Sequence, residues 1–150
     1  MQLSTPTPVK FAEVTEATIK VLVQSFYARV RRDPTLGPIF ARTIAAHAWP
    51  EHLGKMYAFW SSVMLTSGSY KGDPVGVHRK VAGMTPSMFG IWLDLFDATA
   101  MELFVPEIAE SFAHKARRIG ESLRLALFFR PDQSWPDDLR RRPMAYRPCA

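Results

Sequence analysis

Two histidines, His52 and His78, are the side chains of this chain most suited to chemistry by their type and spacing. His52 begins an apolar helical face that continues through Met56, Phe59 and Val63. His78 has a valine three residues to either side of it. A polar ring in such surroundings costs free energy unless something pairs with it. Each ring alone is more often a hydrogen-bonded core histidine, but together they suggest two rings facing each other across a flat apolar ligand, one of them coordinating its metal.

Other kinds of site are not indicated. His47 and His114 complete the set of four histidines, and no two of the four are spaced i, i+3 or i, i+4 as in a local metal motif. The single cysteine, Cys149, excludes a disulfide framework and a cysteine-rich zinc site. No GxSxG, P-loop or GxGxxG motif occurs. Most acidic residues are scattered singly, which is typical of a solvated surface.

The elements that position the histidines follow from apolar periodicity. From Thr15 onward, apolar residues recur at steps of three and four as far as Val30, which predicts an amphipathic helix. Asp33–Pro34 ends it, because a residue before proline disfavours helical geometry. Residues 36–40 are interpreted as a turn that carries two large apolar side chains.

Proline and glycine divide the rest of the chain. The predicted segments are a helix from Trp49 to about Leu65, a loop over 66–73, a short helix over 74–81, a helix beginning at Thr85-Pro86, and a helix from Pro106 that ends before Pro131. No strand-like alternation and no internal repeat is visible. The predicted fold class is therefore all-α, with four long helices and some short ones.

Composition limits the class of protein. A chain of 150 residues and 17.0 kDa is one ordinary domain, and 47% hydrophobic residues with 10 Phe exclude disorder over most of it. We divide it into an N-terminal extension over 1–10, a domain over 11–129 and a Pro/Arg-rich tail over 130–150. The longest uncharged stretch has 15 residues, too few to span a bilayer, and no secretory signal is readable. We therefore expect a soluble, cytoplasmic protein with no membrane partner.

The net charge of +5 invites comparison with nucleic-acid-binding proteins. Residues 130–150 contain five Arg and three Asp, which gives +2, while the other residues hold 14 basic against 11 acidic side chains, which gives +3. The body of the protein is only mildly basic, so we expect no nucleic-acid partner.

Several motifs, taken in their order and spacing, resemble the group III truncated haemoglobins. The resemblance covers about residues 12–128 and is carried by Phe26-Tyr27-x-x-Val30-Arg31-x-Asp33-Pro34-x-Leu36-Gly37-Pro38-Ile39-Phe40, Trp49-x-x-His52, Phe59-Trp60, Gly68-x-Tyr70-x-Gly72-x-Pro74-x-x-x-His78, Phe89-x-x-Trp92-Leu93-x-Leu95-Phe96 and Ala113-x-x-Ala116. It implies a globin-like, two-over-two helical sandwich enclosing haem b. The tail beyond residue 129 has no counterpart in the resemblance.

The resemblance also implies roles for individual residues. His78 matches the proximal histidine that bonds the haem iron, which leaves one coordination position for a diatomic ligand. On the other side, Tyr27 and Trp92 match hydrogen-bond donors to that ligand, and His52 matches a distal histidine that also acts as a gate. Each has a plainer interpretation, as a boundary or core residue.

Four further residues would hold the haem itself. Phe40 matches the phenylalanine that packs on the haem plane, and Met56 and Phe59 would line the cofactor while belonging to the core in either interpretation. Lys55 would reach a haem propionate, although a lysine on a helix is usually just solvated.

Three functions follow from these expectations. The first is reversible binding of O2, and of NO or CO, in an oxygen-carrier type of protein. The second is a haem redox enzyme that detoxifies NO or peroxide, which needs a separate reductase because the 150 residues contain no flavin or nicotinamide domain. The third is a cofactor-free helical interaction module whose Arg-rich tail binds anionic partners.

Overall fold

The computed structural model describes residues 9–129, and about three quarters of these are helical. Its helices are α1 (Glu16–Arg32), α2 (Leu36–Thr43), the 3₁₀ turn η1 (Ala46–Ala48), α3 (Trp49–Leu65), α4 (Pro74–Arg79), α5 (Ser87–Leu103) and α6 (Pro106–Phe128). In the described part of the chain the only β pairing is an isolated parallel bridge between Phe11 and Phe104. The predicted all-α class is confirmed, and so are the four long helices.

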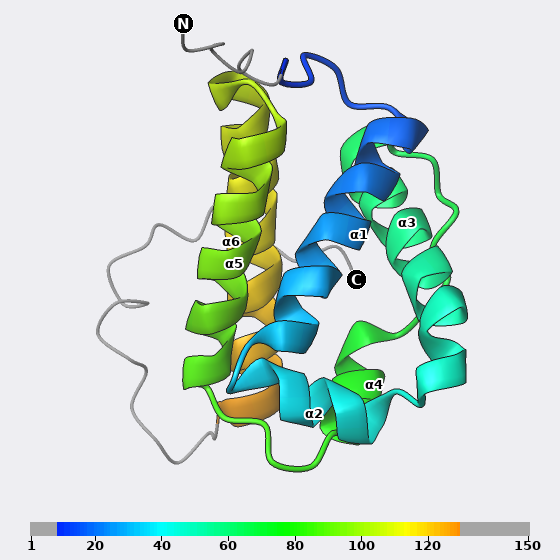
Figure 1. Ribbon diagram of the computed structural model, residues 1–150. Helices are drawn as coiled ribbons and strands as arrows, with labels where there is room; N and C mark the ends of the chain where they lie inside the picture. The colour runs from blue at the N-terminus through cyan, green and yellow to red at the C-terminus, as the bar shows by residue number, and fades with distance from the viewer. Residues whose placement is uncertain (1–8, 130–150) are drawn as a thin grey trace, which may run out of the picture.

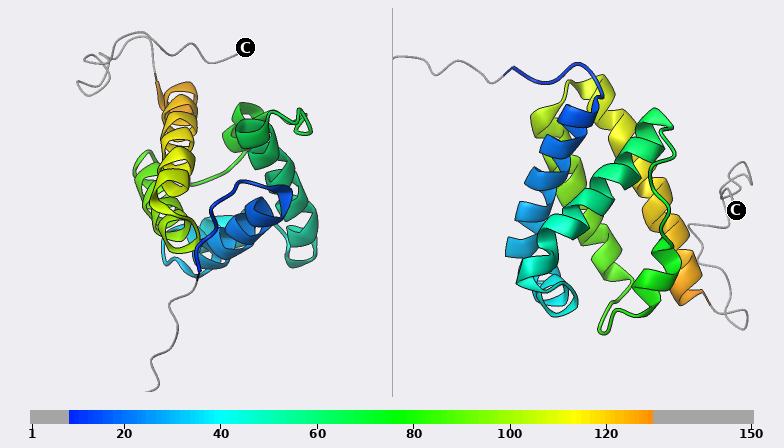
Figure 2. Two further views of the ribbon diagram at one scale, coloured as in Figure 1. Left: turned by 90° about the horizontal axis from the view of Figure 1, so that it is seen from above. Right: turned by 90° about the vertical axis from the view of Figure 1, so that its right-hand side faces the viewer.

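The long helices form two antiparallel pairs (Figure 1). α5 and α6 pack along each other, α1 packs against α3, and α1 also crosses onto α5, so that two helices lie over two. The views of Figure 2 show the same separation of the α5–α6 pair from α3. The loop after α3 runs back along the molecule and brings α4 to the end where α3 begins, beside α6. The first turn of α3, which carries His52, and α4, which carries His78, therefore lie at the same end of the molecule.

Aromatic rings from all four long helices meet in the core. Phe96 of α5 is at the centre: its ring stacks on Trp60 of α3 at 4.8 Å between centroids and meets Phe26 of α1 edge-on at 5.3 Å. Phe112 of α6 lies 6.4 Å from Phe96 on a further side. All four side chains are at most 2% exposed. Such close ring packing fixes the helices relative to one another, and with them the residues beside these rings.

The first helix forms where its periodicity predicts. Thr15 accepts a hydrogen bond from the Thr18 N–H at 3.1 Å, while the Thr18 side chain binds the Thr15 N–H, which closes a capping box. The apolar stripe from Ile19 to Val30 is buried, and the chain turns to extended backbone at Asp33.

The prediction of a turn over residues 36–40 is wrong, because these residues begin the helix α2. The Asp33 carboxylate accepts hydrogen bonds from the N–H groups of Thr35 and Leu36, at 2.9 and 2.8 Å, and so satisfies the start of the helix. Pro38 falls in the first turn, where no N–H is needed. A Cβ on Gly37 would lie 2.7 Å from the Arg31 carbonyl oxygen, so only glycine lets α2 approach α1 this closely.

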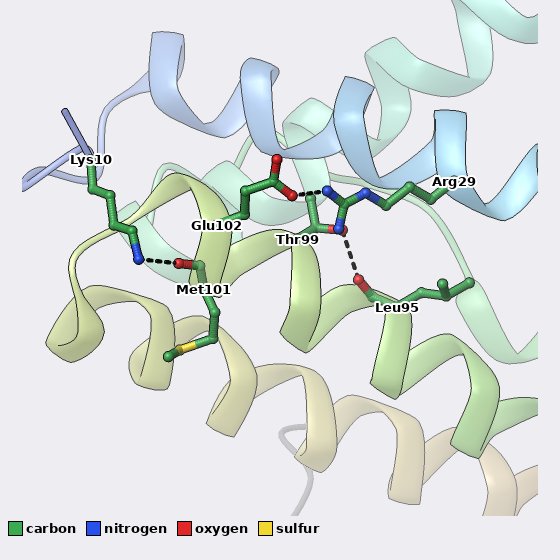
Figure 3. A network of polar contacts seen from close by, with 6 residues as sticks. All are labelled: Lys10, Arg29, Leu95, Thr99, Met101 and Glu102. Carbon is green, nitrogen blue, oxygen red and sulfur yellow. Dashed lines mark hydrogen bonds and ion pairs between the residues drawn. The ribbon is translucent and has the colours of Figure 1, made fainter. Parts of the chain in front are cut away.

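A polar network fixes α1 against α5 (Figure 3). Arg29 of α1 forms an ion pair with Glu102, and its guanidinium also donates to the Thr99 hydroxyl at 3.2 Å. Thr99 is completely buried, and its own hydroxyl donates a hydrogen bond to the Leu95 carbonyl oxygen at 2.7 Å. The network sets the register of α1, which carries Tyr27, along α5.

The segment before α1 is attached to the end of α5. The Lys10 amine donates to the Met101 carbonyl oxygen at 2.8 Å (Figure 3), and the backbone of Phe11 bonds to Leu103 and Val105 on either side of the bridge to Phe104. Of the predicted extension, residues 1–8 lie outside the described residues, and so does the whole predicted tail over 130–150. No helix between residues 9 and 129 is long and apolar enough to cross a membrane.

Candidate functional site

His78 is presented by the short helix α4. Asp73 caps this helix by accepting a hydrogen bond from the Gly76 N–H at 3.1 Å, and Pro74 occupies its first turn. The Nδ1 atom of His78 lies 2.6 Å from the Pro74 carbonyl oxygen. Because a carbonyl oxygen only accepts, Nδ1 carries the proton and donates. In the neutral form of this half-buried ring the lone pair is then on Nε2, and this tautomer can bind a metal through Nε2.

His52 lies in the first turns of α3 and has a buried nitrogen without a partner. Its Nε2 is inaccessible to solvent and makes no hydrogen bond within the described residues. Burial lowers the pKa of the imidazole, and the charges of Lys55 and His78 lower this pKa further. His52 is therefore neutral at pH 7. An unpaired buried nitrogen is costly, which points to a bound group that supplies the partner.

Tyr27 is brought onto His52 by the packing of α1 against α3. The two rings meet edge-on at 5.2 Å, and the tyrosine ring also lies 5.9 Å from Phe40 of α2. Tyr27 is only 6% exposed, and burial raises the pKa of its hydroxyl well above the ordinary value. The hydroxyl therefore keeps its proton over the physiological range and can donate a hydrogen bond.

Trp92 and the apolar residues of α3 stand near this group. Trp92 stacks on Phe96 at 5.7 Å and meets Phe26, the neighbour of Tyr27 in the chain, at 5.5 Å. Met56 and Phe59 are half-buried on the side of α3 that His52 begins, and both pack against the core. The ring contacts thus connect Tyr27 of α1 directly with Phe40 of α2 and His52 of α3, whereas Trp92 of α5 is connected with Tyr27 through Phe26.

The residue expected to reach a haem propionate is Lys55 of α3. Its side chain is exposed and forms an i, i+4 ion pair with Glu51, with 3.6 Å between Nζ and Oε1. Such an exposed pair contributes little stability. His47 and His114 are exposed and take no part in the site.

Trp49 is a member of the group to which the sequence analysis assigned no role of its own, although its motif with His52 carried part of the resemblance. Its indole is 5% exposed and packs 5.3 Å from the ring of His52, 5.9 Å from Tyr27 and 6.2 Å from Phe40. The spacing of three residues between Trp49 and His52 was the available signal, since it puts both side chains on one helical face.

The site offers few metal-binding side chains, which suits a metal ion whose other ligands come from a cofactor. Among residues 9–129 no three His, Cys, Asp or Glu side chains gather closely enough to hold an ion. A single imidazole on α4, a second neutral imidazole on α3 and half-buried apolar side chains fit a flat metal-bearing macrocycle such as haem. A ligand bound to the haem would supply the hydrogen-bond partner that the buried Nε2 of His52 lacks among the described residues.

Comparisons with known proteins agree with this arrangement. No family model matches the chain. The group 3 truncated hemoglobin ctb of Campylobacter jejuni is 30% identical over 122 residues, which covers 80% of this chain and 96% of that protein. The crystal structure of a group III truncated hemoglobin from Campylobacter jejuni superimposes with a TM-score of 0.76 at 30% identity, covering 81% of this chain and 97% of that one. The chain therefore belongs to the group III truncated haemoglobins and has their two-over-two globin fold.

Proposed function

We propose that this globin-type haem protein binds haem b through His78 and reversibly binds O2, and also NO and CO, on the side of the haem that faces Tyr27, His52 and Trp92. The haem-binding unit is the domain over 11–129, and a cytoplasmic location stays a prediction from the sequence. The observation that carries the proposal is the pairing of two imidazoles: one has its Nδ1 fixed by Pro74, and the other has a buried nitrogen without a partner.

Each residue would have a definite task. Haem, when bound, supplies an iron with an open coordination position for a small diatomic ligand. His78 would hold that iron through Nε2, while its hydrogen bond to Pro74 fixes the orientation of the ring. The protonated Tyr27 hydroxyl and the Trp92 indole N–H would donate to the negative end of a polarised ligand.

The remaining residues would enclose the cofactor. Phe40, Met56 and Phe59 would exclude water from it, which strengthens every hydrogen bond to the ligand. Lys55 would have to leave Glu51 to reach a propionate, a small cost for an exposed pair.

The test is an absorption spectrum of the haem-loaded protein in the oxidised, reduced and CO-bound states, compared between the wild type, His78→Ala and His114→Ala. The wild type and the His114→Ala control should show the same Soret band, and it should shift on reduction and on CO binding. His78→Ala should lose this pattern or the haem itself. Identical spectra for His78→Ala and the wild type, or a wild type that takes up no haem, would overturn the proposal.

A second candidate is a haem redox enzyme acting on NO or peroxide. The feature that favours it is His52, whose lowered pKa leaves a neutral imidazole able to accept a proton beside the donor Tyr27. A separate reductase would supply the electrons. Many turnovers of NO or peroxide with such a reductase would support the enzyme, and a single stoichiometric reaction would support the carrier.

A further inference from the structure

The loop after α3 is attached to that helix by serine side chains. Ser61 of α3 is only 2% exposed, and its hydroxyl donates a hydrogen bond to the Glu16 carboxylate of α1 at 2.5 Å. The Ser61 oxygen also lies 2.8 Å from the hydroxyl oxygen of Ser67 in the loop. A hydroxyl has one proton, and Ser61 donates its own to the charged carboxylate, so Ser67 is the donor in this second bond. Ser61 therefore connects α1, α3 and the loop.

A second attachment follows three residues further along the loop. The Tyr70 N–H donates to the Ser62 hydroxyl oxygen at 2.9 Å, and the Tyr70 ring meets Phe59 of α3 edge-on at 5.2 Å between centroids. A Cβ on Gly72 would collide with the Tyr70 hydroxyl and ring, so this ring packs directly on the backbone of the loop. The loop is therefore bound to α3 at both Ser67 and Tyr70.

The backbone is strained where the loop leaves α3. Thr66 has a φ of 54°, in the left-handed region that favours glycine, and within residues 9–129 it is the only residue other than glycine with a positive φ. Such a conformation costs free energy and persists where the surrounding contacts determine it. The bonds made by Ser67 and Tyr70, directly after Thr66, are contacts of this kind.

The short helix α4 depends on this loop for its position. A helix of six residues is not stable alone, so its place is determined by what it is attached to. α4 packs against α6, and only residues 71–73 separate it in the chain from the attached Tyr70. The four steps from Tyr70 to Pro74 span at most about 14 Å. Because Nδ1 of His78 is hydrogen-bonded to the Pro74 carbonyl oxygen, the imidazole moves with the start of α4.

We propose that Ser61 and Ser62 are positioning residues for His78: by binding the loop to α3, they fix where α4 presents the imidazole to the haem. The inference rests on the proposed function, in which His78 binds the iron. Loss of the serine contacts should then alter the iron–imidazole bond, although His78 and every residue assigned to the haem are unchanged. A purely structural role of the serines predicts lower stability alone.

The first test is the iron–imidazole stretching band of the reduced, haem-loaded protein, measured by resonance Raman spectroscopy. Ser62→Ala removes the acceptor for the Tyr70 N–H, and Ser67→Ala removes the donor to Ser61. Each variant should broaden the band, because α4 then takes up several positions. Each should also speed haem transfer to an acceptor globin about fivefold, the factor that corresponds to one hydrogen bond. Ser67→Thr keeps the hydroxyl and should restore the wild-type band and rate.

Ala109→Gly is the matched control for stability. Ala109 is completely buried and lies three residues after the start of α6, at the opposite end of the molecule from α4 (Figure 1). The glycine should lower stability by a factor similar to the loss of one hydrogen bond, because it removes a buried methyl group and weakens the helix. The stretching band and the rate of haem transfer should stay as in the wild type.

A second readout needs no haem chemistry. Amide hydrogen exchange of the full chain should be slow at Tyr70 in the wild type and about fivefold faster in Ser62→Ala, because the N–H loses its acceptor. The amide of Phe104, which donates to the Ala100 carbonyl oxygen at 2.9 Å, is the reference and should exchange at the same rate in both proteins. Faster exchange at both amides would mean that the variant loosens the whole fold, and would contradict a local attachment.

Three further results would overturn the inference. A stretching band and a haem-transfer rate that match the wild type in Ser62→Ala and Ser67→Ala would show that α4 is positioned without the serines, while the proposed function stands. Equal changes in Ala109→Gly would trace the effect to stability alone. A wild type that takes up no haem would remove the proposed function and the positioning role together, and slow exchange at Tyr70 would then show only an attached loop.

Discussion

His52 and His78 differ in what their ring nitrogens contact, and this difference supports the roles proposed for them. His78 has Nδ1 hydrogen-bonded to a backbone carbonyl oxygen, so that in the neutral form of the ring the lone pair is on Nε2. His52 has a buried Nε2 with no partner among residues 9–129 and a pKa lowered by burial. The first is suited to hold a metal, and the second to border its ligand.

Tyr27→Phe tests the donor on the distal side. We expect O2 to dissociate roughly tenfold faster or more, because a buried hydrogen bond to a polarised ligand is worth about 1–3 kcal/mol. CO is less polarised than O2, so its dissociation should change much less. Stopped-flow displacement of O2 by CO measures the rate constant.

Tyr57→Phe is the matched control for that experiment. The Tyr57 hydroxyl accepts a hydrogen bond from Gln24 at 2.9 Å on the outer side of α1 and α3, so its loss should leave O2 dissociation unchanged. Equal O2 dissociation rates in Tyr27→Phe and the wild type would remove Tyr27 from the donor set.

Asp97 gives a prediction on pH. Burial raises the pKa of this carboxyl, and Glu110 and Asp94 add to the rise, while Arg117 at 3.8 Å opposes it. A carboxyl whose folded-state pKa is raised favours the folded state below its unfolded pKa, and that stability is lost as pH rises through the folded pKa.

Asp97→Asn should therefore gain stability relative to the wild type as pH rises above about 4, the unfolded pKa of aspartate. Urea denaturation of both proteins between pH 3 and 7 measures the difference. Glu13→Gln, at an exposed position before α1, is the control and should show no such trend. A difference in unfolding free energy that stays constant with pH would show that folding does not raise the pKa of the Asp97 carboxyl.

At the scale of elements, the network between α1 and α5 combines a buried and an exposed contact. Arg29→Met removes both the hydrogen bond to buried Thr99 and the ion pair, and should lower the unfolding free energy by about 1.5–3 kcal/mol. Glu102→Gln breaks only the exposed half and should cost about 1 kcal/mol or less. Chemical denaturation measures both. Equal losses would place the stabilisation in the ion pair instead.

Asp73, which caps α4, should affect haem only through His78, the residue that this helix carries. Asp73→Ala removes the acceptor for the Gly76 N–H and should weaken α4 by about 1 kcal/mol. Because α4 carries His78 on only six residues, we expect haem to transfer about fivefold faster to an acceptor globin. Thr15→Ala, which removes the cap of α1, should cost similar global stability without this specific effect. Equal haem loss from both variants would show that α4 has no separate role in retention.

At the scale of the whole molecule, haem should act as part of the fold. A ligand that binds only the folded state adds about 4 kcal/mol at a thousandfold excess over its Kd. The haem-loaded wild type should therefore unfold at a higher urea concentration than the haem-free protein. His114→Ala should show the same increase in the urea midpoint, and His78→Ala should lose most of it. An equal midpoint with and without haem would contradict a haem bound within the helical sandwich.

Much of the fold and part of the site could be predicted from the sequence, because helix formation depends on neighbours along the chain. The stripe from Ile19 to Val30, the proline at position 106 and the loop over 66–73 predicted elements that the structure confirms. The helix predicted over 74–81 ends earlier, at Arg79, where Lys80 turns back onto the carbonyls of the last turn. His52 and His78 were predicted as site residues from their surroundings in the sequence and from the resemblance, and Tyr27 from the resemblance alone.

What the sequence by itself determined was therefore the helices and the chemical types of the residues on their faces. The tertiary structure decided which helix ends meet. Only packing of α3 on α1 places Trp49 against Tyr27, and only the path of the loop after α3 brings His78 to the end of the molecule that holds His52. These contacts join residues far apart in the chain, and no local periodicity records them.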